Sequence, residues 1–142
     1  MSDVCIRNAT VDDAAAIAAL IGQLGYDATR AEVEERLRRI EASGHAVLVA
    51  EAEAEVIGCL STSTMHVLHR PAPVGRISMM VVDEALRNRG VGAALVRMAE
   101  RTLAERGCYM VGVTSHVRRT EAHRFYERLG YERTSVRLAR EL

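Results

Sequence analysis

The clearest chemical pattern in the sequence is a pair of arginines and a pair of glycines between an apolar, β-rich run and a helical run. The pattern reads Arg87-x-x-Gly90-x-Gly92; residues 76–82 before it are predicted as a strand and residues 92–106 as a helix. The start of a helix exposes N–H groups without partners and the positive end of the helix dipole, which together bind phosphate. Glycines let the backbone approach an anion closely, and arginines add positive charge. We therefore predict a phosphate-binding turn here.

Two common phosphate-binding motifs do not fit this turn. The Rossmann fingerprint needs three glycines, and only two are present. The P-loop needs a lysine, whereas all 19 basic residues are arginine and the chain contains no lysine. The absence of lysine also excludes a Schiff-base lysine and a lysine general base. Proton transfer in any reaction therefore involves no lysine.

Three segments, taken together, resemble the GNAT superfamily of N-acetyltransferases. Arg87-x-x-Gly90-x-Gly92, preceded by Met80–Asp83, resembles the family's acetyl-CoA pyrophosphate signature. Residues 121–131 resemble its second hallmark, A-x-x-F-Y-x-x-x-G-F/Y, and residues 6–13 resemble its first strand and helix. The segments occur in the family's order and spacing, so the resemblance covers nearly the whole chain.

The resemblance implies acetyl-CoA as co-substrate. No spacing of His, Cys or acidic residues in the sequence looks like a metal site, so we expect no metal. The backbone of Met80, Val81 and Val82 would pair with the pantetheine arm, beside a strand bulge that opens the sheet. The pyrophosphate would be held at Arg87 and by backbone N–H groups of Asn88, Arg89, Gly90, Val91, Gly92 and Ala93. The thioester would then lie between the ends of strands 76–82 and 109–115, near the start of the last helix.

Tyr126 matches the family tyrosine that protonates the leaving thiolate. A phenol with a pKa of about 10 stays protonated at neutral pH and can donate a proton to a thiolate. The alternative is a half-buried aromatic on the core face of its helix, which it would share with Ala122, Phe125 and Leu129.

The sequence departs from the family pattern in two places. Strand positions where many members carry a glutamate base hold Ser78, Met79 and Thr114. The remaining candidates for the base are water or one of the loop histidines His66, His69 and His116. Arg119 stands where many members carry an asparagine beside pantetheine, and we expect it to reach a cofactor phosphate instead.

The elements that must position these residues follow from periodicity and capping signals. Strands are predicted over 4–8, 46–52, 56–64, 76–82, 109–115 and 131–138, and helices over 10–24, 29–40, 92–106 and 120–129. This order predicts an α/β (α+β) fold with a mixed central sheet. By resemblance the sheet is mostly antiparallel, splayed between its fourth and fifth strands and flanked by about four helices. At 142 residues we expect a single domain over 1–142.

Charge and composition narrow the class of partner. The net charge is zero, which argues against nucleic acid, but residues 1–70 sum to −5 and residues 71–142 to +5. A basic half in a neutral chain suits a small polyanionic ligand. No apolar run is long enough to span a bilayer and no signal peptide is recognised, so we expect no membrane partner. The three cysteines are widely spaced, and we expect them to be buried free thiols. Together with the lack of a membrane span and of a recognised signal peptide, they predict a cytoplasmic protein.

The sequence therefore predicts an N-acetyltransferase that moves an acetyl group from acetyl-CoA to a primary amine of a small molecule. Two alternatives stay open: an enzyme that acetylates the N-terminus or a side chain of a protein or peptide, and a non-catalytic acyl-CoA-binding sensor. Homodimers are common in the family, so the resemblance also allows a homodimer.

Overall fold

The computed structural model describes residues 3–142, which form five strands and four α-helices. The strands are β1 (Cys5–Asn8), β2 (Val47–Ala52), β3 (Glu55–Met65), β4 (Val74–Val82) and β5 (Met110–Val113). The helices are α1 (Ala14–Gln23), α2 (Arg30–Ala42), α3 (Val91–Glu105) and α4 (Thr120–Arg128). The chain forms two compact units, one ending at Gly112 and one running from Val113 to Leu142.

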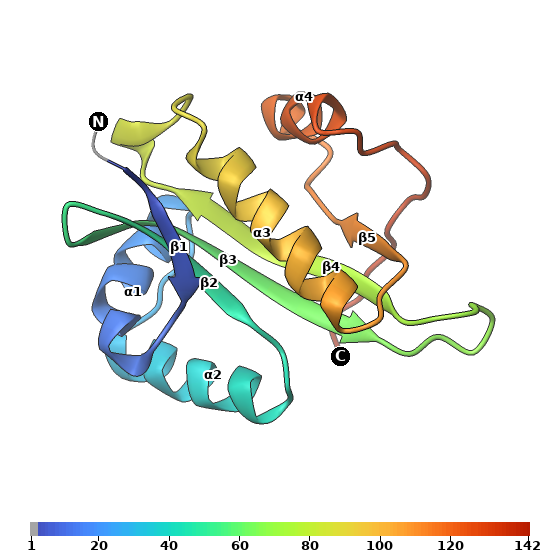
Figure 1. Ribbon diagram of the computed structural model, residues 1–142, viewed down its shortest axis with the longest axis horizontal. Coiled ribbons are helices and arrows are strands. Elements are labelled where there is room, and N and C mark those ends of the chain that lie inside the picture. Colours follow the sequence, from blue (N-terminus) through green and yellow to red (C-terminus); the bar gives the residue numbers. More distant parts are fainter. Residues whose placement is uncertain (1–2) are drawn as a thin grey trace. The chain divides into compact units, whose positions relative to one another are not determined.

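The sheet has the order β1-β2-β3-β4-β5 (Figure 1). The first four strands pair antiparallel with their neighbours, and β5 runs parallel to β4. The predicted α/β class with a mixed, mostly antiparallel sheet is confirmed. No helix within residues 3–142 is both long and apolar enough to cross a membrane.

Local capping signals fix where the first two helices begin. The Asp13 carboxylate accepts from the Thr10 N–H at 2.8 Å, just before α1. Before α2, the Thr29 N–H donates to Glu32 Oε1 at 2.9 Å, and the Glu32 N–H donates to Thr29 Oγ1 at 3.1 Å. Both predicted capping boxes are therefore present, and they satisfy N–H groups that a helix start leaves free.

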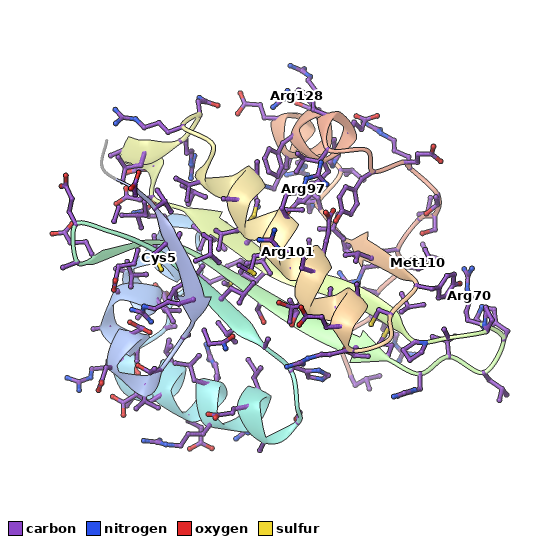
Figure 2. All side chains as sticks on the ribbon, in the orientation of Figure 1. Cys5, Arg70, Arg97, Arg101, Met110 and Arg128 are labelled. Atoms are coloured by element: carbon purple, nitrogen blue, oxygen red, sulfur yellow. The ribbon has the colours of Figure 1, made fainter. Side chains whose placement is uncertain are left out.

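Adjacent residues on β3 show that the helices cover opposite faces of the sheet. Cys59 is fully buried in the core that α1 and α2 form with the sheet. A Cβ added at Gly58 would lie 3.1 Å from the Leu95 side chain of α3. Because successive strand residues point to opposite faces, α3 packs on the face away from α1 and α2 (Figure 1). Arg97 and Arg101 lie on the solvent side of α3 (Figure 2).

A bulge in β4 changes which face its side chains reach. Ile77 pairs with Thr62 and Met79 with Ser61, so Ser78 is the additional residue. Its hydroxyl oxygen lies 3.1 Å from both the carbonyl and the hydroxyl oxygen of Ser61. The bulge therefore turns Met79 toward α1 and α2, although Ile77 faces α3. The resemblance implied a bulge near Met80–Val82, and the structure contains one two residues earlier.

The prediction of a final strand over 131–138 is wrong. No strand follows β5 in the described chain, and every side chain from Glu132 onward is exposed. The alternating residues Val136 and Leu138 are 84% and 91% exposed. Alternation produces a strand only where a neighbouring strand accepts its hydrogen bonds and a face is covered, and this segment has neither. The cysteines are free, and Cys59 is buried as expected, but Cys5 is exposed on β1 (Figure 2).

We predict that the Arg7–Asp13 pair stabilises the start of the fold. Arg7 donates to both Asp13 carboxylate oxygens, at 2.8 and 2.9 Å, and these hydrogen bonds lower the pKa of Asp13. Asp13→Asn should reduce the free energy of unfolding at neutral pH by about 2 kcal/mol, as measured by urea denaturation. A lowered pKa stabilises the fold above the ordinary carboxyl pKa, so the difference should shrink below about pH 4. The exposed neighbour is the control: Asp12→Asn should cost less than about 0.5 kcal/mol, and an equal loss would contradict the assignment.

Candidate active site

The turn between β4 and α3 has the backbone shape that a phosphate site needs. After Val82 the chain makes a 3₁₀ turn over Glu84–Leu86 and is extended at Arg87. Asn88 and Gly90 then adopt left-handed conformations, with φ of +65° and +83°. The second of these brings the chain directly into α3 at Val91. A glycine is the residue that takes this conformation without strain.

The start of α3 is left uncapped. Gly90 has no side chain to cap the helix, and the first helical hydrogen bond runs from the Ala94 N–H to the Gly90 carbonyl at 3.1 Å. The N–H groups of Val91, Gly92 and Ala93 therefore have no partner within the helix. Arg87 and Arg89 are exposed, and neither has an ion-pair or hydrogen-bond partner among residues 3–142. Free donors and free positive charge thus occur together in one short segment, which fits a pyrophosphate.

A side chain from α1 anchors this turn. Gln23 Oε1 accepts from the Glu84 N–H at 2.9 Å, which joins the end of α1 to the beginning of the segment 84–90. This contact could not be predicted from the sequence, because the two residues are far apart along the chain and neither belongs to a motif.

The end of β4 extends beyond its parallel neighbour. The Tyr109 N–H donates to the Pro73 carbonyl at 3.2 Å, so β5 begins beside the first residues of β4. Because β5 has four residues and β4 has nine, β5 covers only the first half of β4. Met80–Val82 lie past that overlap, and their chain continues directly into the phosphate turn.

The second unit carries Tyr126 on α4. Its ring is almost fully buried and makes edge-to-face contacts with Phe125 and Tyr131, with ring centroids 5.0 and 5.6 Å apart. Burial raises the pKa of Tyr126 to about 12, although the positive charge of Arg119 acts in the opposite direction. The phenol is therefore protonated at neutral pH, which suits a proton donor.

Arg119 and His116 form the entrance to α4. The Arg119 N–H donates to the His116 carbonyl at 2.9 Å, and His116 Nδ1 accepts from the Arg118 N–H at 3.1 Å. The preceding Ser115 hydroxyl is buried and has no hydrogen-bond partner within residues 3–142. An orphaned buried hydroxyl is a group that a bound ligand or water can satisfy. Ser115 could not be predicted as a site residue, because a serine at a strand end carries no signal of its own.

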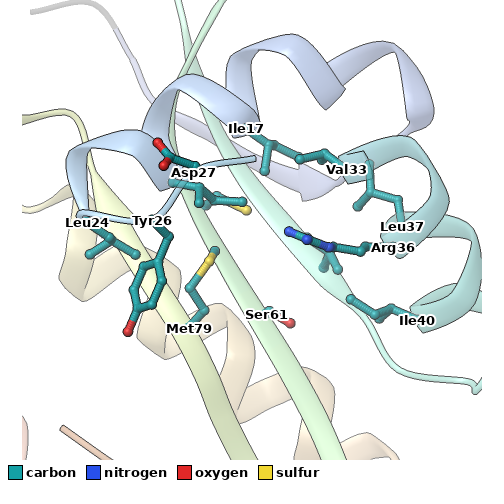
Figure 3. A pocket seen from close by; sticks show the side chains of 13 residues that line it. Ile17, Leu24, Tyr26, Asp27, Val33, Arg36, Leu37, Ile40, Ser61 and Met79 are labelled. Carbon is teal, nitrogen blue, oxygen red and sulfur yellow. The ribbon is translucent and has the colours of Figure 1, made fainter. Parts of the chain in front are cut away.

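A pocket of about 370 Å³ lies between α1, α2 and the sheet (Figure 3). Its walls are mostly aliphatic, and the β4 bulge places Met79 in its lining. The lining residues are Ile17, Ile21, Leu24, Tyr26, Asp27, Val33, Arg36, Leu37, Ile40, Val47, Cys59, Ser61 and Met79. His66 and His69, two of the predicted base candidates, are exposed on the loop between β3 and β4 and do not line it. The pocket carboxylate, Asp27, was not among those candidates.

No group of three or more His, Cys, Asp or Glu side chains within residues 3–142 is placed to hold a metal ion. The predicted residues Met80–Val82 end β4, and Arg87–Ala93 follow after the 3₁₀ turn and lead into the first turn of α3. Tyr126 and Arg119 lie together at α4, in the second unit.

Residues 15–131 match the Acetyltransferase (GNAT) family, and the chain belongs to this family. The resemblance predicted from the sequence is confirmed, and the protein is a GNAT-type N-acetyltransferase. The family uses acetyl-CoA.

Two relatives show the range of related enzymes. An aminoalkylphosphonate N-acetyltransferase from Salmonella typhimurium is 30% identical over 145 residues, covering 98% of this chain and 92% of the relative. An aminoglycoside N(6')-acetyltransferase from Stenotrophomonas maltophilia is 30% identical over 132 residues, covering 91% and 86%.

Solved structures agree on the fold. Glucosamine-6-phosphate N-acetyltransferase from Arabidopsis thaliana is 24% identical and has a TM-score of 0.86, covering 99% of both chains. An aminoglycoside N-acetyltransferase in complex with CoA is 23% identical and has a TM-score of 0.87, covering 99% of this chain and 96% of that one.

We predict that a side chain at Gly92 blocks the phosphate turn. Gly92→Val places a branched side chain in the first turn of α3, among the free N–H groups. The dissociation constant for CoA, measured by isothermal titration calorimetry, should rise by at least about tenfold.

Gly22→Ala is the matched control, because Gly22 lies within α1 and an added Cβ there meets nothing within 4 Å. Its CoA affinity should equal that of the native protein. Native affinity in Gly92→Val would remove the turn from the cofactor site.

Proposed function

We propose that residues 1–142 act as one acetyl-CoA-dependent enzyme that acetylates the primary amine of a small molecule. The observation that carries this proposal is the segment after β4: a left-handed turn at Gly90, an uncapped start of α3 and two arginines without partners.

Acetyl-CoA binds along this segment. The N–H groups of residues 88–93 hold the pyrophosphate, with Arg87 and Arg89 supplying charge. The backbone of Met80–Val82, past the end of β5, pairs with the pantetheine arm as an added strand would. Arg119 contributes a second positive charge for the cofactor phosphates.

The reaction is a direct acyl transfer. The neutral amine nitrogen attacks the thioester carbonyl, the C–N bond forms, and the C–S bond breaks with its electron pair going to sulfur. Tyr126 donates its phenolic proton to that thiolate, and the proton shed by the acylated nitrogen returns the Tyr126 phenolate to the phenol. The net products are the acetamide, CoA thiol and, from the original ammonium, one proton.

A small-molecule acceptor is supported by two observations. The relatives named above acetylate, by their names, an aminoalkylphosphonate and an aminoglycoside. The pocket between α1, α2 and the sheet is at the lower end of the range for small-molecule sites, at about 370 Å³. Its Met79 is the residue directly before the stretch that would pair with pantetheine.

The test is release of CoA thiol from acetyl-CoA in the presence of a panel of small-molecule amines and of peptides with free N-termini. We expect turnover with members of the small-molecule set. Turnover with peptides alone would replace this acceptor class by protein, and CoA binding without turnover for any amine would favour a sensor.

Tyr126→Phe tests the role of the phenol in the same assay. Loss of the proton donor should lower kcat by about 100-fold, while the dissociation constant of CoA stays within about twofold. Because the pKa of Tyr126 is about 12, the ratio of native to variant rates should not change between neutral pH and about pH 10.

Tyr109→Phe is the control, because Tyr109 is an exposed tyrosine of the first unit that contacts Arg70. It should keep the native rate. An unchanged kcat in Tyr126→Phe would remove the proposed acid.

A further inference from the structure

We propose that the pocket between α1, α2 and the sheet binds an amine with an apolar body and one anionic group, and that Arg36 binds that anion. This inference rests on the proposed function, since it names the chemistry of the acceptor.

The walls of the pocket are mostly apolar, which favours a ligand with an apolar body. Ile17, Val33 and Cys59 of the lining all belong to the buried core. The polar side chains in the lining are few: Tyr26, Asp27, Arg36 and Ser61. A polyhydroxylated or polycationic ligand would leave most of its polar groups against aliphatic carbon, which costs free energy.

Arg36 differs from the other arginines of its helix. Arg30, Arg38 and Arg39 pair with glutamates one turn away at 2.9, 3.6 and 2.8 Å. Arg36 lies 3.9 Å from Glu32 Oε2, the longest of these separations. Glu32 cannot close the gap freely, because its other carboxylate oxygen is held by the Thr29 N–H in the capping box.

The guanidinium of Arg36 is therefore weakly paired, as is that of Arg38 at 3.6 Å, and of the two only Arg36 lines the pocket, where it is the one basic side chain. Figure 3 shows it extending from α2 toward the segment that carries Tyr26 and Asp27. Its planar donors suit a carboxylate or phosphonate, which can accept two hydrogen bonds at once.

The position of Arg36 also sets the order of groups along the acceptor. The sheet wall of the pocket includes Met79 and Ser61, and Met79 adjoins the stretch proposed for pantetheine. The amine must reach that wall to attack the thioester, whereas the anion stays at α2. The acceptor therefore carries its amine and its anion at opposite ends of an apolar body.

The lining also weighs against polycations. Asp27 is the one carboxylate among the lining residues, and it has no hydrogen-bond or ion-pair partner within the described part of the chain. Asp27 can balance one positive charge at most, and Arg36 repels any further positive charge on a ligand.

The experiment uses a series of ω-aminoalkanoates of increasing chain length, each with its uncharged carboxamide twin, and kanamycin as the polycation. We expect kcat/KM to favour the aminoalkanoate over its twin by about tenfold or more at the best length, and kanamycin to be the poorest acceptor. In Arg36→Met, which keeps the aliphatic stem, the ratio between twins should fall to near one.

Arg39→Met is the matched control, because Arg39 lies on the same helix, pairs with Glu35 and does not line the pocket. It should keep the native ratio. Equal rates for the twins with the native protein, a ratio unchanged by Arg36→Met, or a preference for kanamycin would each overturn the inference.

The two proposals fail in different ways. If neither this series nor the amine panel above is acetylated, the proposed function fails, and the inference is decided by binding of 6-aminohexanoate and 6-aminohexanamide to the CoA-saturated protein, measured by calorimetry. Tighter binding of the carboxylate that is lost in Arg36→Met supports the anion site, and equal binding of the two refutes it.

Discussion

The difference in length between β4 and its parallel neighbour β5 is the constraint on which the site depends. β5 begins beside Pro73 and ends after four residues, so the last residues of β4 extend past it. The backbone groups there keep their capacity to pair with an extended ligand. The same stretch then turns through Gly90 into the uncapped start of α3. One continuous segment therefore offers both an edge for an extended arm and donors for a phosphate.

The bulge at Ser78 connects the end of β4 to the pocket on the opposite face of the sheet. By shifting the alternation of side chains, it turns Met79 away from α3 and into the pocket on the opposite face. A ligand along the end of β4 and a ligand in the pocket would thus meet at neighbouring residues. The hydrogen bond from the Glu84 N–H to Gln23 Oε1 joins the end of α1, which borders the pocket, to the start of the turn after β4.

Local sequence signals were sufficient to predict most of the fold and the turn between β4 and α3. Thr29 with Glu32 marked the start of α2, and Arg87-x-x-Gly90-x-Gly92 marked the turn, because capping and left-handed glycines act over a few residues. The prediction of a strand over 131–138 was wrong because strand pairing is a long-range property, which the alternation of Val136 and Leu138 cannot establish alone. The pocket was missed for a similar reason: Arg36 is one of four similar arginines on α2, and only the structure shows which one has a distant partner. In a chain without lysine, arginine is the one residue type for both surface ion pairs and candidate anion sites, and on α2 the distances to neighbouring glutamates help to tell them apart.

Backbone amide signals, followed by NMR while CoA is added to the native protein, test the proposed cofactor site directly. We expect the largest chemical-shift changes at residues 80–82 and 88–93, because this part of the chain would contact the pantetheine and the pyrophosphate. Saturable CoA binding that leaves these amides unchanged, with the shifts gathered in the loop between β3 and β4 instead, would contradict it.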